Sequence, residues 1–357
     1  TVPKNHQDFF NFLNSTIEPW DGPAAICATD AKWVLASTDR NGLRPLRYAI
    51  TSDNLFFAGS EAGMINIAEE KIIEKGKLGP GQIIAIDLKK GKLFKDKQIK
   101  DYLAKEYKKY SKQIVDLEKK ISTEAEKAKF SGEELKKRQY LSGLSIEDLE
   151  LILHPMAEEG KEASGSMGDD TPVAVLSSHF RPVSHYFRQN FSQVTNPPID
   201  SLRENKVMSL KTRFGNLGNI LDFDNLTKED IYVLDSPILT NSQFSKFCKI
   251  FSKKIKTIDC TFEVNSSLKE RIESIKIECE TAVREGSTTL ILSDKNISEK
   301  RASIPSALSV GAAHSHLVKN SLRGYCSLNV ECSDALDTHS FAVLIGVGAT
   351  TINPYLA

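Results

Sequence analysis

Short alternations of apolar and polar residues dominate the first hundred positions and predict antiparallel β-strands. Their expected ranges are 24–29, 33–38, 47–51, 54–59, 83–87 and 92–95, and turn-forming residues separate them. Apolar residues at helical spacing between Phe9 and Ile17 predict a helix over 6–17, with Asn5 as its cap. A second helix is expected at about 61–75. Together these elements predict an α+β block.

The pattern changes twice further along the chain. Charged residues dominate from 98 to about 139, which predicts a solvent-facing helical connector. Ser145 with Asp148 and Ser267 with Glu270 then form helix-capping patterns. The expected order after Ser267 is a helix to Gly286, a strand at 288–292, a helix from Pro305, a strand at 325–331, a helix near 338–347 and a final extended segment. This order predicts parallel βαβ units and an α/β domain.

Composition narrows the function classes. The 357 residues hold 47 Lys+Arg and 47 Asp+Glu, so no basic excess favours nucleic acid or a membrane surface as a partner. No apolar run is long enough to span a bilayer and no secretory signal pattern is visible, so we expect a cytoplasmic protein. The six cysteines follow no framework spacing, which predicts reduced thiols.

Two groups of residues resemble metal ligands at first sight. Cys326 and Cys332 flank a strand-like segment with no third or fourth ligand after it, so structural thiols are favoured over an iron–sulfur or metal site. His314 and His316 are two apart on an expected helix and point in different directions, and His339 lies in another element. We therefore predict no metal site.

A turn between two expected strands carries the most distinctive local pattern, D-R-N-G-L-R-P-L at 39–46. Gly42 can adopt a positive φ, and Asp39 with Arg40 is expected to form a charge-assisted pair that braces the loop. After the next strand, Ser60 is expected as an N-cap and Glu61 in the first turn of a helix. On spacing alone, a well-made turn explains this pattern better than a catalytic loop does.

The pattern D-R-N-G-x-R-P-L-R-Y at 39–48, followed by S-E-A-G at 60–63, resembles the second half of a class II glutamine amidotransferase domain. More narrowly, E-P-W-D-G-P-A-A-I at 18–26 is similar to the large subunit of glutamate synthase. Stretches similar to that family's central domain lie at 138–177, 187–221, 289–295, 304–317 and 352–357. The resemblance implies a partial Ntn-hydrolase-type antiparallel sandwich, followed by much of the central domain. The expected boundaries are 1–115 for the amidotransferase part, 116–140 for the charged connector and 141–357 for the central domain.

This resemblance implies a parent enzyme that converts glutamine and 2-oxoglutarate into two glutamates. In the family an N-terminal cysteine releases ammonia from glutamine, and the ammonia passes through a tunnel to a flavin domain that reduces 2-iminoglutarate. FMN and an iron–sulfur cluster are the implied cofactors of the parent. The implied partner is a pyridine-nucleotide-dependent small subunit or ferredoxin, and the sequence does not decide between them.

The family's catalytic residues do not carry over to this chain. Its nucleophilic cysteine and glutamine-clamping residues correspond to positions before Thr1, and its flavin and cluster motifs to positions after Ala357. We therefore expect an internal fragment with no catalytic residue and no cofactor of its own, inactive alone, whose partners are the flanking domains. Thr1 as a nucleophile is disfavoured, because the first 15 residues are similar to an internal helix of the family.

Two sets of residues are left with supporting roles. The amidotransferase set consists of Asp39, Arg40, Gly42, Arg44, Pro45, Ser60 and Glu61. The candidates for a tunnel or interdomain surface are Gln193, Thr195, Asn196, Asp200, Arg203 and Glu204, for which a structural polar network is an equal alternative. Residues 167–171 form either an interdomain contact or a loop capped by its own aspartates.

Two other functions stay open at this point. The chain is either a non-catalytic scaffold or interdomain module, or a piece of another class II amidotransferase, such as a phosphoribosyl or asparagine-forming enzyme. The second alternative shares the R-P-L turn, but the matches at 138–221 disfavour it.

Overall fold

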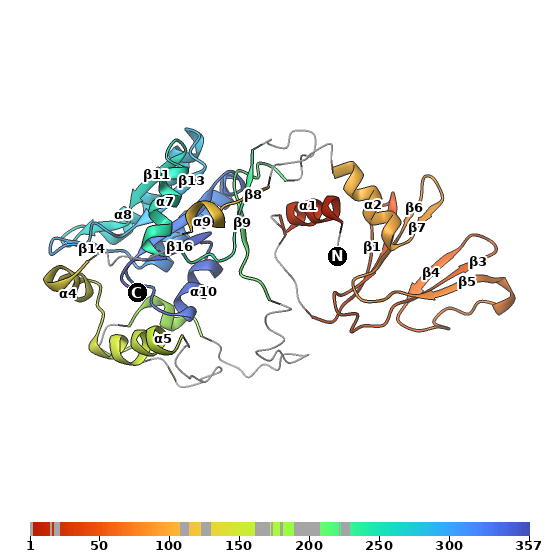
Figure 1. Cartoon of the computed structure of the whole chain (residues 1–357), viewed down its shortest axis with the longest axis horizontal. Coiled ribbons are helices and arrows are strands. Elements are labelled where there is room, and N and C mark those ends of the chain that lie inside the picture. The colour runs from red at the N-terminus through yellow and green to blue at the C-terminus, as the bar shows by residue number, and fades with distance from the viewer. Residues whose placement is uncertain are drawn as a thin grey trace. The chain divides into compact units, whose positions relative to one another are not determined.

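The computed structural model describes residues 3–14, 16–17, 22–107, 114–122, 130–160, 172, 174–178, 181–188, 208–220, 222 and 229–357. These residues fall into two units: those up to Tyr107 make up the first, and those from Ile114 onward make up the second. Figure 1 labels the helices and strands of both units. No helix among the described residues is long and apolar enough to cross a membrane.

The strands of the first unit are all antiparallel. Their bounds are β1 Ala25–Thr29, β2 Trp33–Thr38, β3 Arg47–Thr51, β4 Phe56–Gly59, β5 Ile72–Lys77, β6 Ile83–Asp87 and β7 Lys92–Phe94. One sheet has the order β1-β2-β6-β7, and the other has the order β4-β3-β5. The six strands predicted from the alternating pattern are each present within two residues of their expected bounds. The structure thus confirms these strand predictions.

Two helices accompany these sheets, α1 (Lys4–Leu13) and α2 (Asp96–Tyr107). They pack against each other, and the His6 Nε2 atom lies 2.7 Å from the Asp101 Oδ1 atom. Helix α1 begins directly after Pro3, so Asn5 lies inside the helix and the predicted Asn5 cap is wrong. Pro3 is the N-cap residue, and its carbonyl accepts a hydrogen bond from the Gln7 N–H at 3.0 Å.

Side chains on β2 and β6 alternate between two packing environments. Leu35 and Ala85 pack with Ile99 of α2. Ala36 and Ile84 face the opposite way and pack against the second sheet. The first unit is therefore layered as helix, sheet and sheet, with one small apolar cluster on each side of the β1-β2-β6-β7 sheet.

The helix expected at about 61–75 is not formed. A 3₁₀ turn, η1 (Glu69–Lys71), leads instead into β5, whose residues alternate between partly buried and exposed positions. At Gly76 of β5 a Cβ atom would lie 2.4 Å from the Tyr48 ring, so only glycine fits beside that ring. The prediction was wrong because pairing with β3 determines the conformation of these residues, and local sequence does not report that pairing.

A small mixed sheet opens the second unit. Its strands are β8 (Ile114–Asp116), β9 (Thr212–Phe214) and β10 (Ile231–Leu234), in the order β8-β10-β9. Directly after β8, Leu117 is fully buried, and so is Ile121 in the short helix α3 (Glu118–Ile121) that follows it. These two residues fall in the stretch expected to be a solvent-facing connector, so that description is wrong at Leu117 and Ile121.

A four-stranded parallel sheet forms the centre of the second unit. The strands β11 (Ile255–Asp259), β13 (Thr289–Ser293), β15 (Ser327–Cys332) and β16 (Thr351–Pro354) lie side by side in chain order. Between them run the helices α8 (Leu268–Arg284), α9 (Ser306–Lys319) and α10 (Thr338–Gly346). This is the βαβ series that the sequence predicted. The Ser267 cap is also confirmed, because the Ser267 hydroxyl accepts a hydrogen bond from the Glu270 N–H.

Shorter elements complete the second unit. They are α4 Gly132–Leu141, η3 Asp148–Leu153, α5 His154–Glu159, η4 Val183–Tyr186, α7 Asn241–Ile250, β12 Thr261–Glu263, β14 Arg301–Ser303 and η5 Arg323–Tyr325. Ser145 and Asp148 exchange hydrogen bonds as a capping pair should: the Asp148 N–H donates to Ser145 Oγ, and the Ser145 N–H donates to Asp148 Oδ2.

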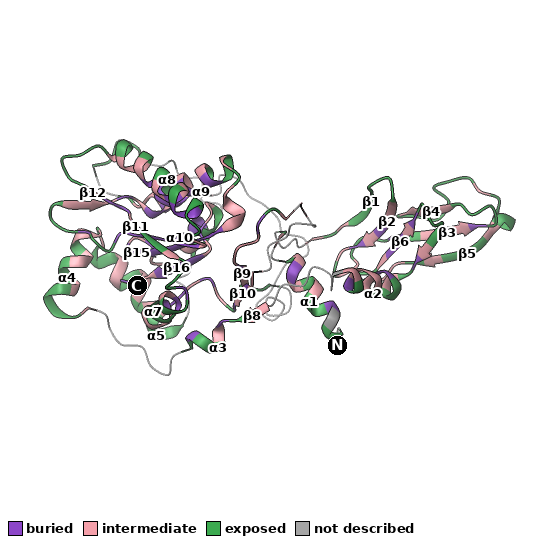
Figure 2. Ribbon diagram, turned by 90° about the horizontal axis from the view of Figure 1, so that it is seen from above, coloured by how far each residue is buried: buried purple, intermediate pink, exposed green. Residues whose placement is uncertain are grey.

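Apolar residues cover both faces of the parallel sheet. Leu290 and Leu292 of β13 point into a cluster of twenty buried residues shared with α8, α9 and α10. Ile291, between them in sequence, points the other way into a second cluster with Phe247 of α7 and Phe214 of β9. Figure 2 shows β15 and β16 of the parallel sheet as largely buried, whereas β1 in the first unit is exposed along its length.

Candidate functional site

Strand pairing in the first unit brings the two predicted motifs to the same end of one sheet. Arg47, at the start of β3, pairs with Gly59 at the end of β4 and with Lys77 at the end of β5. The turn at 39–46 runs into β3, and the S-E-A-G segment at 60–63 follows β4. The segments 39–46, 60–63 and 78–81 therefore meet at this end, and the candidate site lies here.

The Asp39 carboxylate holds the turn in shape through main-chain hydrogen bonds. It accepts from the backbone N–H groups of Asn41 at 3.0 Å, Leu43 at 3.0 Å, Arg44 at 3.3 Å and Ala24 at 3.3 Å. Burial opposes ionisation of this carboxyl, but the N–H donors, led by Leu43, outweigh that effect and lower its pKa below the usual value. Backbone N–H donors therefore brace the loop through the Asp39 carboxylate.

A second turn, at residues 79–81, packs against the turn at 39–46. Gly42 has a φ of +63°, and a Cβ atom there would lie 2.9 Å from Pro80 Cγ. The Gly81 N–H donates to the Asp39 carbonyl at 2.8 Å, and the Thr38 hydroxyl donates to the Gly79 carbonyl at 2.6 Å. Glycine at 42 is therefore required twice, by its backbone conformation and by this close approach.

The other predicted residues of this set lie on the surface. Arg40, Arg44 and Pro45 are exposed, and the next residue, Leu46, is buried in the core between the sheets. Ser60 and Glu61 are exposed in an irregular segment, so the expected helix-capping roles of Ser60 and Glu61 are wrong. All seven members of the set belong to segments that reach the same end of the sheet.

A groove of about 590 Å³ runs along the S-E-A-G segment. Apolar side chains line much of it, among them Phe57, Met64, Ile65 and Ile72. Charged side chains also line it: Arg47, Glu61, Glu69, Lys75 and Lys77. Such a surface can hold an apolar segment or ligand with a polar margin. The described residues that line it include no paired nucleophile and base of the kind that acyl transfer requires.

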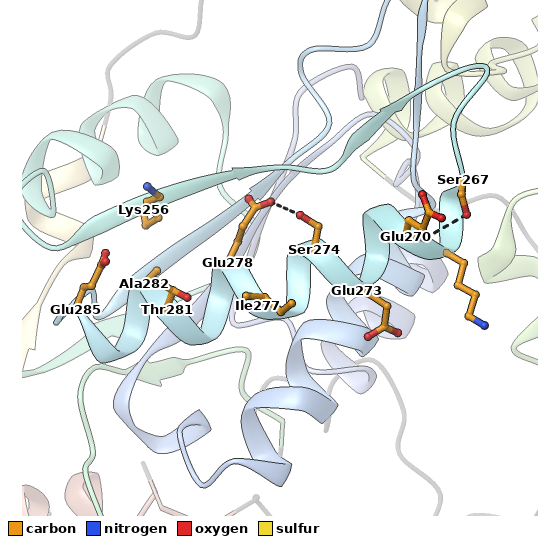
Figure 3. A pocket seen from close by; sticks show the side chains of 11 residues that line it. Lys256, Ser267, Glu270, Glu273, Ser274, Ile277, Glu278, Thr281, Ala282 and Glu285 are labelled. Atoms are coloured by element: carbon orange, nitrogen blue, oxygen red, sulfur yellow. Dashed lines mark hydrogen bonds between the residues drawn. The ribbon is translucent and has the colours of Figure 1, made fainter.

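A larger open groove, about 990 Å³, lies along α8 in the second unit (Figure 3). Two of its carboxylates have local partners. Glu278 accepts from the Ser274 hydroxyl at 2.9 Å and pairs with Arg271 at 2.5 Å. Glu273 pairs with Lys276 at 2.7 Å. These contacts are those of a solvated helix face, and they assemble no reactive group.

The candidates for a tunnel or interdomain surface, namely Gln193, Thr195, Asn196, Asp200, Arg203 and Glu204, all lie outside the described residues. The same holds for 167–171. Their roles therefore stay predictions from the sequence.

The residues that resemble metal ligands are held apart in the structure. His314 accepts from the Arg323 Nε–H at 3.2 Å, His316 Nε2 lies 2.7 Å from Glu280 Oε2, and His339 Nε2 lies 2.9 Å from the Ser184 carbonyl oxygen. In the described part of the chain, no three His, Cys, Asp or Glu side chains converge on a point where a metal ion would bind.

The buried cysteines do not suit an iron–sulfur cluster. Burial raises the pKa of Cys326 to about 11 and that of Cys260 to about 12, so both remain neutral thiols at physiological pH. Cys279 and Cys332 are also buried in the same apolar cluster, and burial raises their pKa values too. Cluster ligands are thiolates, and these four positions disfavour that form.

One polar cluster in the second unit was not predicted from the sequence. Asp294 follows β13, Asp334 follows β15, and both lie at the carboxyl edge of the parallel sheet with Ser306 and Ser333. The signal was present, because polar residues directly after two buried-type strands are typical of this edge. The separate strand predictions gave no reason to connect residues 40 positions apart.

Family comparisons agree with the two-part architecture, in which antiparallel sheets precede a parallel α/β sheet. Residues 1–112 match the family described as class-II glutamine amidotransferases. Residues 137–357 match the family described as the glutamate synthase central domain. Because this second match covers more than half of the chain, the chain belongs to the glutamate synthase family.

Curated relatives match along the whole chain. The NADPH-dependent glutamate synthase large chain of Azospirillum brasilense is 52% identical over 365 residues, which cover 100% of this chain and 24% of the relative. The corresponding large chain of Bacillus subtilis is 38% identical, with 100% and 23% covered. Ferredoxin-dependent glutamate synthase 2 of Synechocystis is 40% identical, with 98% and 23% covered. The chain spans about a quarter of the length of these relatives.

Proposed function

We propose that this chain is part of a glutamate synthase that converts glutamine and 2-oxoglutarate into two molecules of glutamate. The observation that carries the proposal is the order of the two family matches, with an amidotransferase segment directly ahead of a central domain. Another class II amidotransferase would explain the first match and leave residues 137–357 unexplained. The whole-chain similarity to synthases from several organisms supports the same conclusion.

The first unit is proposed to be part of an Ntn-hydrolase-type sandwich. Its helix, sheet and sheet layers are those expected of part of such a domain. The turn at 39–46 has a supporting role in this proposal. Asp39 and Gly42 fix its backbone.

The proposed boundaries are 1–115 for the amidotransferase part, 116–140 for the connector and 141–357 for the central domain. Burial of Leu117 and Ile121 supports counting the first residues of this connector with the second unit. The polar residues between Gln193 and Glu204 are proposed to line the ammonia route or an interdomain surface.

FMN and an iron–sulfur cluster are proposed as cofactors of the parent enzyme. These cofactors would supply hydride transfer and electron transfer. The four buried cysteines described above do not fit the cluster, so its ligands are expected elsewhere in the parent. The electron donor is proposed to be a pyridine-nucleotide-dependent small subunit or ferredoxin, since relatives of both kinds match. A cytoplasmic location is part of the proposal.

The proposal is tested on the native protein that contains this chain. The protein is purified, identified by peptides from the chain, and assayed for glutamate formation from glutamine and 2-oxoglutarate with NADPH or reduced ferredoxin. We expect two glutamates per glutamine consumed with one of the two donors. Glutamine hydrolysis coupled to a different acceptor would indicate another amidotransferase. A pure protein with neither activity would support the scaffold alternative.

A further inference from the structure

The carboxyl edge of the parallel sheet holds two buried carboxyl groups that the proposed function does not use. Asp294 follows β13, and its side chain is 2% exposed. Its Oδ2 atom accepts from the Ser333 N–H at 3.0 Å and from the Ser333 hydroxyl at 2.6 Å. Asp334, the next residue along, accepts from the N–H of Ser306 at 2.9 Å and from its hydroxyl at 2.6 Å. The loops after β13 and β15 are thereby tied to each other and to the start of α9.

A segment from much earlier in the sequence covers this edge. The Phe130 ring packs edge-on against the Tyr355 ring, with 6.1 Å between centroids. The guanidinium of Arg138, on α4, lies 4.3 Å from the centroid of the Phe130 ring. Arg138 Nη1 also donates to the Lys295 carbonyl at 3.2 Å. Residues 130–141, which we name the clasp, therefore rest on the loop after β13 and on the residue after β16.

A further contact fixes the outer side of the clasp. Lys137 Nζ lies 2.7 Å from Glu299 Oε1, in the loop that follows Asp294. Both side chains are well exposed, so this ion pair adds little by itself. The stacked Arg138 and Phe130 are the contacts that a change at the carboxyl edge would disturb, since they meet Lys295 and Tyr355 directly.

The surroundings of Asp294 favour its neutral form. Burial comes first, and the second carboxyl group, Asp334, adds like-charge repulsion; together they raise the pKa of Asp294 to about 7. Burial and the neighbouring Asp294 likewise raise the pKa of Tyr355. Burial raises the pKa of Asp334 as well. The Ser333 donors act in the opposite direction but do not outweigh burial.

The other charged or titratable groups around this edge do not neutralise Asp294. Lys295 lies 3.9 Å from Glu331 and is oriented to that carboxylate. The Arg138 side chain pairs with Glu134 at 2.7 Å. Cys260, after β11, and Cys332, at the end of β15, are buried thiols whose pKa values burial raises. Among the described residues, a negative charge on Asp294 would therefore have the Ser333 donors and the Tyr355 hydroxyl near it but no cation paired with it.

We propose that the clasp and the carboxyl edge form a proton-dependent device, in which the clasp is held closed while Asp294 carries a proton. When Asp294 loses its proton, a negative charge is buried beside the Asp334 carboxyl group and the Tyr355 side chain, against whose ring Phe130 packs. Opening of the clasp admits water to that charge and relieves the repulsion. The device therefore closes at lower pH and loosens as the pH rises toward neutrality.

The sign and size follow from proton linkage. In the open state Asp294 is solvated and has an ordinary carboxyl pKa, so the open form gains on the closed form as the pH rises from about 4 to about 7. Between pH 5 and pH 7 the opening equilibrium is expected to increase at least about tenfold, and to change little above pH 7.

Hydrogen exchange of the full chain, read by mass spectrometry at pH 5, 6 and 7 and corrected for intrinsic rates, tests this. We expect peptides covering 130–141 to lose at least about tenfold in protection between pH 5 and pH 7. Asp294→Asn, which mimics the neutral carboxyl, should keep at pH 7 the protection that the wild type has at pH 5. Asp337→Asn is the matched control, because Asp337 also accepts from a serine N–H and hydroxyl but caps α10. This control should leave the pH dependence of 130–141 unchanged.

A second measurement covers the case in which Asp294→Asn does not fold. Carboxyl carbon resonances of the wild type are followed by NMR through the same pH range, and Arg138→Met is examined for exchange. A carboxyl that titrates well above its ordinary range, together with pH-independent low protection in Arg138→Met, supports the proposal. Protection of 130–141 that does not vary between pH 5 and pH 7 overturns it. So does a pH dependence that persists in a folded Asp294→Asn protein.

Discussion

The two units bury their apolar residues in different ways. In the second unit, consecutive βαβ connections place helices over one face of the parallel sheet, and α7 with the small sheet covers the other. In the first unit, two clusters of three buried residues lie on either side of a sheet whose edge strand, β1, is exposed throughout. A parallel sheet completes its own covering layers through its connections, whereas an antiparallel sheet depends on what else is brought to its faces.

Exposed apolar side chains show the same difference. Ile26 of β1 is 49% exposed, Met64 is 64% exposed, and Ile73 of β5 is 66% exposed. In the second unit the corresponding positions of the central strands are buried. The free energy of unfolding of the first unit should therefore depend less on any single core residue of its own.

The largest expected effect is on the core of the second unit. Leu328→Ala removes a fully buried side chain of β15 from a cluster of twenty residues and should lower the free energy of unfolding by about 3–5 kcal/mol. Ile84→Ala in the first unit should cost less, about 2 kcal/mol, because its cluster is small and its neighbours are only partly buried. Both losses are measured by urea denaturation, with hydrogen exchange as the probe that reports unfolding of each unit separately.

The exposed Ile277→Ala on α8 is the control, and its effect should stay within about 0.5 kcal/mol. Equal losses in the free energy of unfolding from Leu328→Ala and Ile84→Ala would show that a core side chain contributes equally to stability in both units. That result would contradict the proposed difference between the units.

A glycine substitution sharpens the comparison at the candidate site. Gly42→Ala should destabilise the first unit by about 2–3 kcal/mol, because it combines a positive φ with a Cβ atom against Pro80. Gly91→Ala is the matched control: it has a similar φ of +59° and nothing within 4 Å, so its expected cost is about 1 kcal/mol. Thermal melts of both variants give the difference. Identical losses would mean that the turn at 79–81 yields without cost.

The Asp39 carboxylate should make the first unit sensitive to acid. Its pKa is lowered in the folded protein, so its stabilising contribution is present above the ordinary carboxyl pKa and is lost as the pH falls through the lowered value. Asp39→Asn should therefore melt below the wild type at pH 7, and the difference should shrink as the pH falls below the ordinary carboxyl pKa. A melting difference that persists in acid would show that the carboxylate charge is not what holds the turn.

The smallest expected effect concerns a helix end in the second unit. Ser267→Ala removes the acceptor for the Glu270 N–H and should cost about 1 kcal/mol. Ser267→Asp retains an acceptor and should restore most of that stability. If both variants behave alike in urea denaturation, the side-chain cap contributes nothing measurable to α8.

The alternating and helical patterns predicted most of the strands and the βαβ series, because those elements bury one face of a regular period. The helix expected at 61–75 failed because β5 is fixed by its neighbour β3, a contact across more than twenty residues. The prediction of a solvent-facing connector was wrong at Leu117 and Ile121 for a similar reason. Two apolar residues in a charged stretch gain their burial from α7, which lies more than a hundred residues further along the chain.

The sequence predicted which residues form the candidate site, but only some of the contacts that hold them in place. The sequence indicated that Asp39 braces a turn, but it suggested Arg40 as the partner, since a charge pair is visible in sequence and backbone N–H groups are not. The convergence of 39–46 with 60–63 follows from strand register. No single segment reports register, because it depends on which faces become buried.

The position of β16 in the parallel sheet also determines when its neighbours can form their hydrogen bonds during synthesis. This strand pairs with β15 on one side, and on the other side Ile352 accepts a hydrogen bond from the Leu239 N–H at 2.8 Å. Asn353 meets the Leu239 carbonyl across 114 residues of sequence. At synthesis rates of about 5–20 residues per second, residues 237–239 wait roughly 6–23 seconds for this neighbour. During that interval their backbone groups remain open to water, to chaperones and to other nascent chains.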